Sequence, residues 1–405
     1  MGIMEILVFG EVDEACRQQL INCMDETSIG VLTADGHKGY SHPIGGAIAY
    51  KNKVSVSGVG FDIACGNKAV RTDILADEID VSGVMDEIYK RISFGVGRVN
   101  DEPADHEIFE KIKQAEFQPQ RKLLQLARTQ LGTVGSGNHY IDLFRDDSGF
   151  LWIGVHFGSR GFGHKTASGF IAIHQGLKFE DKAYEGSMDS PPVLFDITSP
   201  SGEAYIHAMQ LAGEYAYAGR DMVVNKVLEI LDRPKVTFEV HNHHNFAWKE
   251  SHFGENYWVV RKGCTPAFPD QLGFIGSNMM DKSVIVEGID NELSKKTLYS
   301  TVHGAGRVMS RTQAAGKKKW IYNAAQNRKI PTLISRGLVD FDHTLEMMKI
   351  KGIELRGSGA DESPQCYKKL DEVLGHMGDT IRILHTLSPI GVAMAGSDTF
   401  DPYKD

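Results

Sequence analysis

The stretch VTFEVHNHHNF, residues 236–246, decides the fold class and raises the question of function. Its first five residues alternate apolar with polar side chains, which is the period-two pattern of a half-buried strand. Similar strand-like runs lie at 5–9, 53–57, 151–156, 192–197, 257–261 and 283–288. Helical periodicity lies at 81–92, 107–131, about 203–231 and 367–376. Because strands and helices do not alternate regularly, we predict an α+β fold with largely antiparallel sheets and flanking helices.

Composition indicates a soluble globular protein. The chain has 405 residues, 41% hydrophobic and 24% charged, and no linker or repeat divides it, so we expect one domain over 1–405. No window reaches the ~18 apolar residues of a membrane span, and the start of the chain lacks a leader pattern, which predicts a cytoplasmic protein without membrane contact. Five widely spaced cysteines fit a reducing compartment.

Charge gives a mixed indication about nucleic acids. The net charge of −9 argues against indiscriminate nucleic-acid binding, although a local basic groove can hold phosphates on an acidic protein. Lys317, Lys318 and Lys319 form one local basic run. A lysine triplet of this kind is more often a solvated helix face.

Three histidines follow the strand pattern of the opening stretch: His241, His243 and His244. Imidazole can bind transition metals, act as a general base or act as a nucleophile. If the strand continues, His241 and His243 face away from His244, because strand side chains alternate. Other parts of the chain must therefore decide the chemistry.

Glycine concentrates in short polar stretches. Glycine permits positive φ and close backbone approach, and consecutive amides in such turns form anion-binding nests. One stretch alone is most simply a tight turn, whereas five together favour one composite site. The stretches are GVGFDIACGNK (58–68), GTVGSGNHY (132–140), VHFGSRGFGHK (155–165), GFIGSN (273–278) and VHGAGRVMSR (302–311).

Candidate metal ligands lie within or beside these stretches. Asp62 and Cys65 are three residues apart, so one turn can direct a carboxylate and a thiolate at one ion. His139, His156 and His244 add imidazoles, and the set suits Zn, Mn, Fe or Co better than Ca or Mg. The alternative is that each histidine is packed or hydrogen-bonded and that Cys65 is a small buried hydrophobe.

The stretch STVHGAGRVMSRT, residues 300–312, is the most specific single piece. His303 precedes a close-approach turn, and Arg307 and Arg311 lie one helical turn apart, where they can clamp phosphate. Neither a Gly-x-Ser-x-Gly elbow nor a Gly-x-x-x-x-Gly-Lys-Ser/Thr loop is present. Attack by a histidine on a nucleotide α-phosphate would give a covalent phosphoramidate.

Nine motifs follow one another along the chain. They are ADGHKG, GFDIACGNKAVRT, GTVGSGNHY, HFGSRGFGH, HHNFAWKESHFGE, RKGCTPA, GSNMMDKSVIVEG, HGAGRVMSRT and ESPQCYKKLDEV. In this order they resemble the RtcB family of RNA-splicing ligases. The resemblance runs from about residue 34 to 396, and so many long motifs in one order make chance similarity remote.

The resemblance implies a monomeric, GTP- and Mn(II)-dependent ligase, with two Mn ions, built around a central metal and nucleotide pocket. Such an enzyme joins RNA 2′,3′-cyclic-phosphate or 3′-phosphate ends to 5′-hydroxyl ends in RNA repair or tRNA splicing. His303 would be the nucleophile that takes GMP. The metal ligands implied are Asp62, Cys65, His139, His156 and His244. The nucleotide-binding residues implied are Asn138, Asp142, Asn245, Gly276, Ser277, His303, Gly304, Ala305, Gly306, Arg307 and Tyr367, the last stacking on guanine, and the RNA-phosphate residues are Arg160 and Arg311.

Three positions depart from the family pattern. Met394 or Ala395 stands where the family has a lysine that reaches the guanylate, and Lys404 is the only lysine in the tail that could substitute. Asp142 replaces a glutamate that resembles a guanine contact, and Asn278 stands in a segment that usually reads Pro-Gly-Ser-Met-Gly. These departures predict altered nucleotide affinity or a different terminal reaction. The alternatives are therefore a 3′-phosphate guanylyl-capping enzyme that joins poorly and a non-catalytic module that binds metal and RNA ends.

Overall fold

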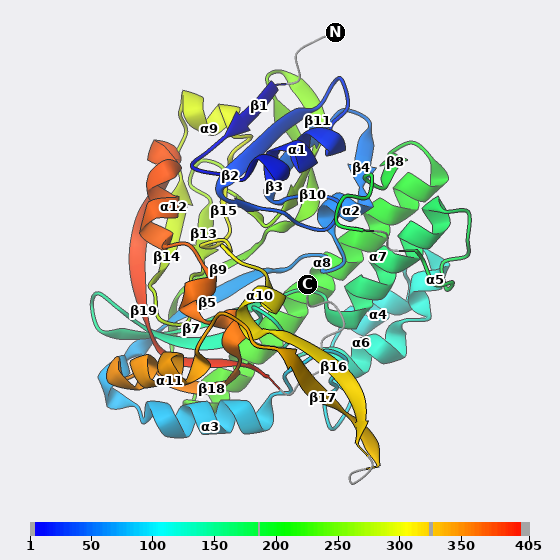
Figure 1. Cartoon of the computed structure of the whole chain (residues 1–405). Coiled ribbons are helices and arrows are strands. Elements are labelled where there is room, and N and C mark those ends of the chain that lie inside the picture. The colour runs from blue at the N-terminus through cyan, green and yellow to red at the C-terminus, as the bar shows by residue number, and fades with distance from the viewer. Residues whose placement is uncertain (1–4, 185–186, 324–326, 398–405) are drawn as a thin grey trace.

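A curled, largely antiparallel sheet forms the centre of the molecule (Figure 1). The structure is a computed structural model that describes residues 5–184, 187–323 and 327–397. The strand order is β13-β14-β19-β6-β7-β5-β9, and β18 joins β19 in parallel. The two edges approach each other, because the Phe274 N–H of β13 donates to Asn242 Oδ1 of β9 at 3.0 Å, so the sheet nearly closes on itself. The strands are β5 (Gly66–Leu75), β6 (Tyr140–Asp146), β7 (Phe150–Phe157), β9 (Val236–His243), β13 (Leu272–Ile275), β14 (Ser283–Gly288), β18 (Glu354–Ser358) and β19 (Ile381–Gly396).

A second, smaller sheet has the strand order β1-β2-β3-β11-β10. Its strands pair antiparallel except for β1 and β2, which run parallel. Three two-stranded pairs accompany the sheets, and one of them, β16–β17, projects from the body at the lower right of Figure 1. The smaller sheet contains β1 (Glu5–Val8), β2 (Ile29–His37), β3 (Ile44–Tyr50), β10 (Asn245–His252) and β11 (Glu255–Lys262). The pairs are β4 (Lys53–Ser55) with β8 (Leu194–Asp196), β12 (Cys264–Pro266) with β15 (Ser300–Val302), and β16 (Lys317–Asn323) with β17 (Arg328–Ser335).

The long helix α8 (Pro200–Ile230) connects the two main hydrophobic cores. Ser199 caps its first turn by accepting the Gly202 N–H at 3.1 Å, and Pro200 occupies a position that needs no amide partner. Residues such as Met209 pack with α7 under the smaller sheet, and Val223 packs against the larger one. The other helices are α1 (Glu14–Cys23), α2 (Val56–Val59), α3 (Val81–Arg91), α4 (Ile108–Lys113), α5 (Gln118–Arg121), α6 (Leu124–Gln130), α7 (Arg160–His174), α9 (Glu292–Lys296), α10 (Arg311–Ala315), α11 (Phe341–Ile350) and α12 (Leu370–His376), with 3-10 turns η1 (Ala76–Glu78), η2 (Ala360–Glu362), η3 (Pro364–Cys366) and η4 (Gly378–Thr380).

The predicted α+β class with largely antiparallel sheets is confirmed. Most predicted strands and the helices at 81–92 and 203–231 are present. Strand β7 is almost entirely buried rather than half-buried, because Trp152 faces the interior of the curled sheet and Ile153 faces the helices outside it. Among the described residues, no helix combines the length and apolar character needed to cross a bilayer.

The prediction of one helix over 107–131 is wrong. Three short helices lie there instead, because Phe117 is extended and Pro119 lacks an amide hydrogen. The strand predicted at 53–57 ends at Ser55, whose hydroxyl accepts the Gly58 N–H at 2.9 Å and starts α2. The strand at 192–197 shortens to β8, the helix at 367–376 begins at Leu370, and the lysine triplet lies on β16 rather than on a helix.

Candidate active site and metal centre

Most of the predicted metal ligands lie at adjacent ends of neighbouring strands in the larger sheet. The start of β5 pairs with the ends of β7 and β9, and the start of β6 pairs with the end of β7. His156 lies near the end of β7, Cys65 and His139 immediately precede β5 and β6, and His244 immediately follows β9. Antiparallel pairing therefore brings together residues that are far apart in the sequence.

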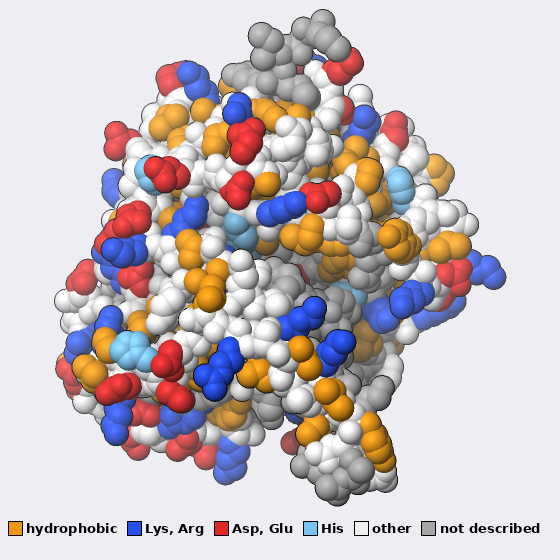
Figure 2. Space-filling view, viewed as in Figure 1, with side chains coloured by type: hydrophobic (Ala, Val, Ile, Leu, Met, Phe, Trp, Pro, Cys, Tyr) orange, Lys and Arg blue, Asp and Glu red, His pale blue; other side chains and the backbone are white. Residues whose placement is uncertain are grey.

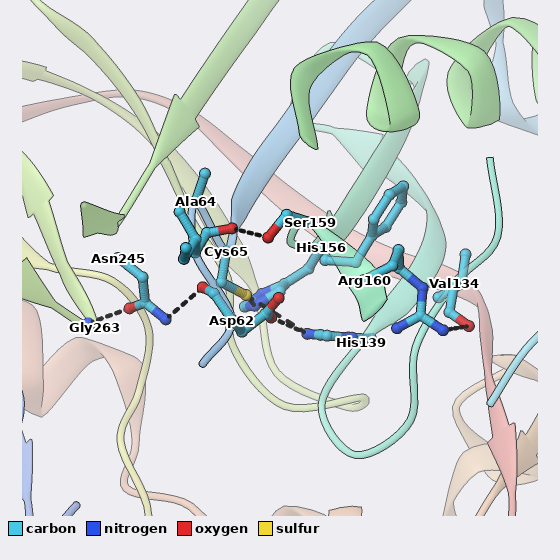
Figure 3. Close-up of polar contacts among 12 residues, drawn as sticks. Asp62, Ala64, Cys65, Val134, His139, His156, Ser159, Arg160, Asn245 and Gly263 are labelled. Carbon is cyan, nitrogen blue, oxygen red and sulfur yellow. Dashed lines mark hydrogen bonds and ion pairs between the residues drawn. The ribbon is translucent and has the colours of Figure 1, made fainter. Parts of the chain in front are cut away.

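The donor atoms form two overlapping groups that share the Cys65 thiol. Its Sγ lies 3.1 Å from His156 Nε2 and 3.5 Å from His139 Nε2, and His139 Nε2 lies 3.0 Å from an Asp62 oxygen (Figure 3). Within each group all donor atoms lie within 4.8 Å of one another. The groups are Cys65, His156 and His244, and Asp62, Cys65 and His139.

Burial sets the protonation of these donors. Desolvation and the nearby Asp62 raise the pKa of the Cys65 thiol well above its ordinary value. Desolvation and neighbouring imidazoles lower the pKa of His156 and His244 well below the usual range. Burial alone would raise the Asp62 pKa, but His139 outweighs it and lowers that pKa to about 2. Neutral imidazoles beside a carboxylate and a displaceable thiol proton fit a transition-metal cation.

One buried imidazole nitrogen supports the same fit. Nδ1 of His244 is shielded from solvent and has no hydrogen-bond partner among the residues that the structure describes. Buried polar atoms without partners are uncommon in folded proteins and usually indicate a missing water or ion. The donor set is therefore compatible with the metal centre that the sequence predicts.

His241 and His243 belong to neither donor group, as strand alternation predicts. The His241 ring stacks on Tyr217 at 3.8 Å between centroids and accepts a hydrogen bond from Arg220 Nε at 2.9 Å. His243 stacks on Phe246 with centroids 4.8 Å apart. Both rings pack on the side of β9 that faces α8.

His303 is oriented by a carboxylate from the smaller sheet. Its Nδ1 lies 2.6 Å from Asp35 Oδ2, which also accepts the His303 backbone N–H at 3.0 Å. The hydroxyl of Thr33 donates to the other Asp35 oxygen at 2.6 Å. Burial alone would raise the Asp35 pKa, but His303 and Thr33 lower it below its usual value. Because a carboxylate only accepts, His303 Nδ1 carries the proton of this hydrogen bond, and in the neutral imidazole Nε2 is the nitrogen that keeps a lone pair.

A cavity of about 190 Å³ opens beside His303 and His156. Every residue predicted to bind nucleotide lines it except Asn245, and Arg311 lines it as well. Asn245 instead donates to the Asp62 carbonyl at 3.3 Å and accepts the Gly263 N–H at 2.7 Å (Figure 3). Asn245 therefore ties the loop that contains Asp62 to the turn at Gly263, which follows β11.

The arginines of this cavity already face acidic partners. Arg307 donates to the Tyr367 hydroxyl at 3.1 Å, and its guanidinium lies 5.0 Å from the centre of that ring. Arg311 forms ion pairs with Asp361, at 3.4 Å, and with Glu362. Both acids are buried, and Glu362 also lies 3.7 Å from Arg307, so a phosphate that binds either arginine must compete with a desolvated carboxylate.

Arg160 lies at a different cavity from Arg311. This second cavity has a volume of about 610 Å³ and is lined by Asp62, His139 and Arg160. Arg160 donates to the Gly95 carbonyl at 2.8 Å and to the Val134 carbonyl at 3.3 Å (Figure 3). The metal donors therefore stand between two cavities, and the two residues predicted to bind RNA phosphate are not adjacent.

The three departures from the family pattern all lie in the first cavity. Met394 lines it and packs in a small apolar cluster with Tyr140 and Met279. Asp142 lines it too, with Oδ1 lacking a hydrogen-bond partner among the described residues, and burial raises its pKa well above the usual value. Asn278 completes this wall, whereas Lys404 lies outside the described residues.

Sequence reasoning missed Asp35 and Glu362 as site residues. Both lie inside motifs that the sequence analysis quotes, ADGHKG and ESPQCYKKLDEV. The available signal was in each case a carboxylate in a motif rich in small or polar residues. The partner of Asp35 is His303 and the partner of Glu362 is Arg311, and both partners are distant in the sequence. Pairing of this kind becomes visible only in the folded chain.

Comparison with known proteins gives one consistent result. Residues 20–395 match the sequence model of the family described as tRNA-splicing ligase RtcB. The chain is 30% identical over 412 residues to the RNA-splicing ligase RtcB of Escherichia coli (strain K12), covering 94% of each chain. It is 28% identical over 440 residues to the tRNA-splicing ligase RtcB of Thermococcus kodakarensis, covering 90% of this chain and 87% of the relative. It is also 28% identical to RNA-splicing ligase RtcB homolog 1 of Entamoeba histolytica, covering 88% of this chain and 78% of that protein.

Proposed function

The chain belongs to the RtcB family of tRNA-splicing ligases, and from that membership we propose that it is a GTP-dependent RNA ligase. In this proposal it joins RNA 2′,3′-cyclic-phosphate or 3′-phosphate ends to 5′-hydroxyl ends. The observation that carries the proposal is His303, whose Nδ1 is held by Asp35, at the wall of a cavity that also contains the candidate metal donor His156.

The first step is guanylylation of the protein. His303 Nε2 attacks the α-phosphorus of GTP, an N–P bond forms, and the O–P bond to pyrophosphate breaks. The imidazole gains positive charge as the bond forms, and the Asp35 carboxylate, 2.6 Å from Nδ1, stabilises that charge. Mn(II) held by the two donor groups would neutralise charge on the phosphate oxygens.

The next two steps consume the stored bond. An oxygen of the RNA 3′-phosphate takes the guanylate, which breaks the N–P bond and returns His303 to its starting form. The RNA 5′-hydroxyl then attacks the 3′-phosphorus, forms the new phosphodiester and releases GMP. Asn138, which lines the cavity next to the ligand His139, is placed to orient phosphate oxygens during these transfers.

A capping enzyme without efficient joining is the second candidate, and one observation favours it. Met394, one of the two residues that stand where the family has a guanylate-binding lysine, gives the cavity an apolar wall, and the other, Ala395, carries no charge either. Loss of that cation would weaken the hold on guanylate during sealing. A non-catalytic module is less consistent with the site, because a binding protein has no need of the buried Asp35 beside His303.

One assay separates these three functions. The protein is incubated with labelled GTP and Mn(II), then chased with a 3′-phosphate RNA and finally with a 5′-hydroxyl RNA. A ligase gives joined RNA, a capping enzyme accumulates guanylylated RNA ends, and a binding module forms no protein adduct. Joined product supports the proposal, and either of the other results contradicts it.

Substitution of Asp35 tests its role as a positioning residue. We expect Asp35→Asn to slow guanylylation about 100-fold or more, because the amide cannot neutralise the imidazolium and can hold the wrong tautomer. The measurement is the initial rate of adduct formation as a function of GTP concentration. The rate constant should fall while the GTP concentration at half-maximal rate stays nearly constant. An unchanged rate constant would remove Asp35 from the mechanism.

Asp142 is expected to recognise the base. The N–H groups of guanine are donors. Burial raises the pKa of Asp142 in the cavity, but two such donors would stabilise its ionised form and make it the matching acceptor, whereas adenine offers no such pair of donors. We expect Asp142→Asn to lower the preference for GTP over ATP about tenfold, the size expected for one buried polar mismatch of about 1–2 kcal/mol. Asp142→Glu, which restores the family residue, is the matched control and should keep the preference. Equal GTP-to-ATP rate ratios in wild type and Asp142→Asn would exclude this contact.

A further inference from the structure

The described residues of the β16–β17 hairpin line neither of the two cavities above and belong to neither donor group. Its two strands pair with each other over Lys318–Asn323 and Arg328–Leu333 and make few contacts with any other element. It projects from the body of the molecule next to α10 (Figure 1). An isolated two-stranded hairpin is only marginally stable in water, so contact with a ligand would stabilise it where core packing does not.

The hairpin lies in a long basic tract of an otherwise acidic protein. Between residues 293 and 339 the chain contains no Asp or Glu, although its net charge is −9. The same tract contains many cations. They are Lys295, Lys296, Arg307, Arg311, Lys317, Lys318, Lys319, Arg328, Lys329 and Arg336. Lys295, Arg307 and Arg311 pair with acids outside the tract, so the positive field comes from the cations of the hairpin and its base, and such a field attracts polyanions.

The hairpin is attached directly to the wall of the nucleotide cavity. Arg311 lines that cavity and begins α10, and only Gly316 separates α10 from β16. A Cβ at Gly316 would lie 2.2 Å from the Ser335 carbonyl oxygen, and a Cβ at Gly337 would lie 2.0 Å from the Ala314 carbonyl oxygen. The segments that enter and leave the hairpin therefore pass each other at Gly316 and Gly337, in a space that only glycine permits.

The described side chains of the hairpin are exposed and mixed in type. Lys317, Lys319 and Arg336 are exposed, and none of them has an ion-pair partner within the described part of the chain. Tyr322 is 58% exposed and Leu333 is 50% exposed. Figure 2 shows apolar side chains along the projecting hairpin and basic ones near its base. Cations that bind phosphates beside rings on which bases stack are the features of single-stranded nucleic-acid binding.

We propose that the β16–β17 hairpin is an RNA-binding arm that holds single-stranded RNA leading into the active site. This inference rests on the proposed function, since it states how that substrate is held outside the cavity. The exposed apolar side chains alone would also fit a protein partner. The absence of any acid across the tract favours RNA, because a surface of one positive sign attracts a polyanion.

Two variants test the arm. In the first, Lys317→Ser, Lys319→Ser and Arg336→Ser are combined, and the control combines Lys178→Ser, Lys182→Ser and Lys235→Ser, which are exposed cations elsewhere. In the second, residues 317–336 are removed and Gly316 is joined to Gly337, whose backbones already lie in contact. The probes are a long single-stranded RNA with a 3′-phosphate and a dinucleotide with the same end.

We expect the triple variant to bind the long RNA about tenfold more weakly than wild type, and the deletion to bind it more weakly still. The slope of log affinity against log salt should fall by about 2 in the triple variant, since each lost single-strand phosphate contact removes about 0.7. Dinucleotide affinity and GTP-dependent protein labelling should not change. The control triple should match wild type throughout.

Unchanged affinity and salt slope for the long RNA in both variants would overturn the proposal. So would a deletion that leaves RNA binding intact but abolishes self-association in sedimentation, because the hairpin would then join two copies of the chain. If wild type neither labels itself nor joins RNA, yet binds long RNA in a hairpin-dependent way, the proposed function fails while the arm stands.

Discussion

His303→Ala will leave no guanylate on the protein. Wild type incubated with GTP and Mn(II) should carry an acid-labile, alkali-resistant adduct, as expected for an N–P bond. Removal of the nucleophile should lower the rate of adduct formation by about 10⁴-fold or more, because no weaker contact replaces a missing bond-forming atom. Peptide mapping of labelled wild type should place the GMP on residue 303.

The variant should remain folded, which makes the result interpretable. Asp35 loses the imidazole but keeps the Thr33 hydroxyl and the backbone N–H of residue 303. The loss of one hydrogen bond to a charged group costs about 1.5–3 kcal/mol, which is less than the usual stability of a domain. His243→Gln, outside the cavity, is the control and should label normally. A persistent adduct in His303→Ala would move the nucleophile elsewhere, with His37, which lines the same cavity, the first residue to examine.

Short-range patterns were enough to predict much of the fold. The alternation at 236–240 and the helical spacing at 203–231 correspond to β9 and α8, because both elements bury one consistent face. Helix α7 was missed because its glycines at 161, 163 and 169 indicate a turn. In the structure Gly169 serves packing, since a Cβ there would lie 2.2 Å from the Phe179 ring.

Strand β19 was missed for a different reason. Its sixteen residues contain Ser388-Pro389 in the middle, and proline ordinarily argues against an interior strand. The structure accommodates Pro389 at a register shift between β19 and β6, where a ladder hydrogen bond is not required. Local patterns cannot show that such a shift exists, because it depends on the partner strand.

The candidate site, like the fold, could be predicted only in part from local sequence patterns. Residue types beside strand ends indicated metal ligands, but the resemblance to a family was needed to select five donors among the many histidines and acids. Asp35 and His303 are in contact although 268 positions separate them, so no local pattern predicts that pair. The ion pair of Arg311 with Glu362 is another such case, and it changes the expected field of the cavity from basic to nearly balanced.

Cys65→Ala is expected to remove metal from both donor groups, because its thiol is the only ligand that the groups share. By elemental analysis, Asp62→Ala and His244→Ala should each retain about half the manganese of wild type, whereas Cys65→Ala should retain almost none. Labelling with GTP should be lost in parallel in Cys65→Ala.

The fold of Cys65→Ala should survive the loss of metal. The substitution removes one small buried atom, so thermal unfolding of the metal-free variant should lie within a few degrees of metal-free wild type, as for a change of about 1 kcal/mol. Cys264→Ala is the matched control, since Cys264 is equally buried and belongs to neither donor group. If Cys65→Ala holds as much manganese as Cys264→Ala, the thiol does not bridge the groups. The ligands would then have to be sought among the acids of the two flanking cavities.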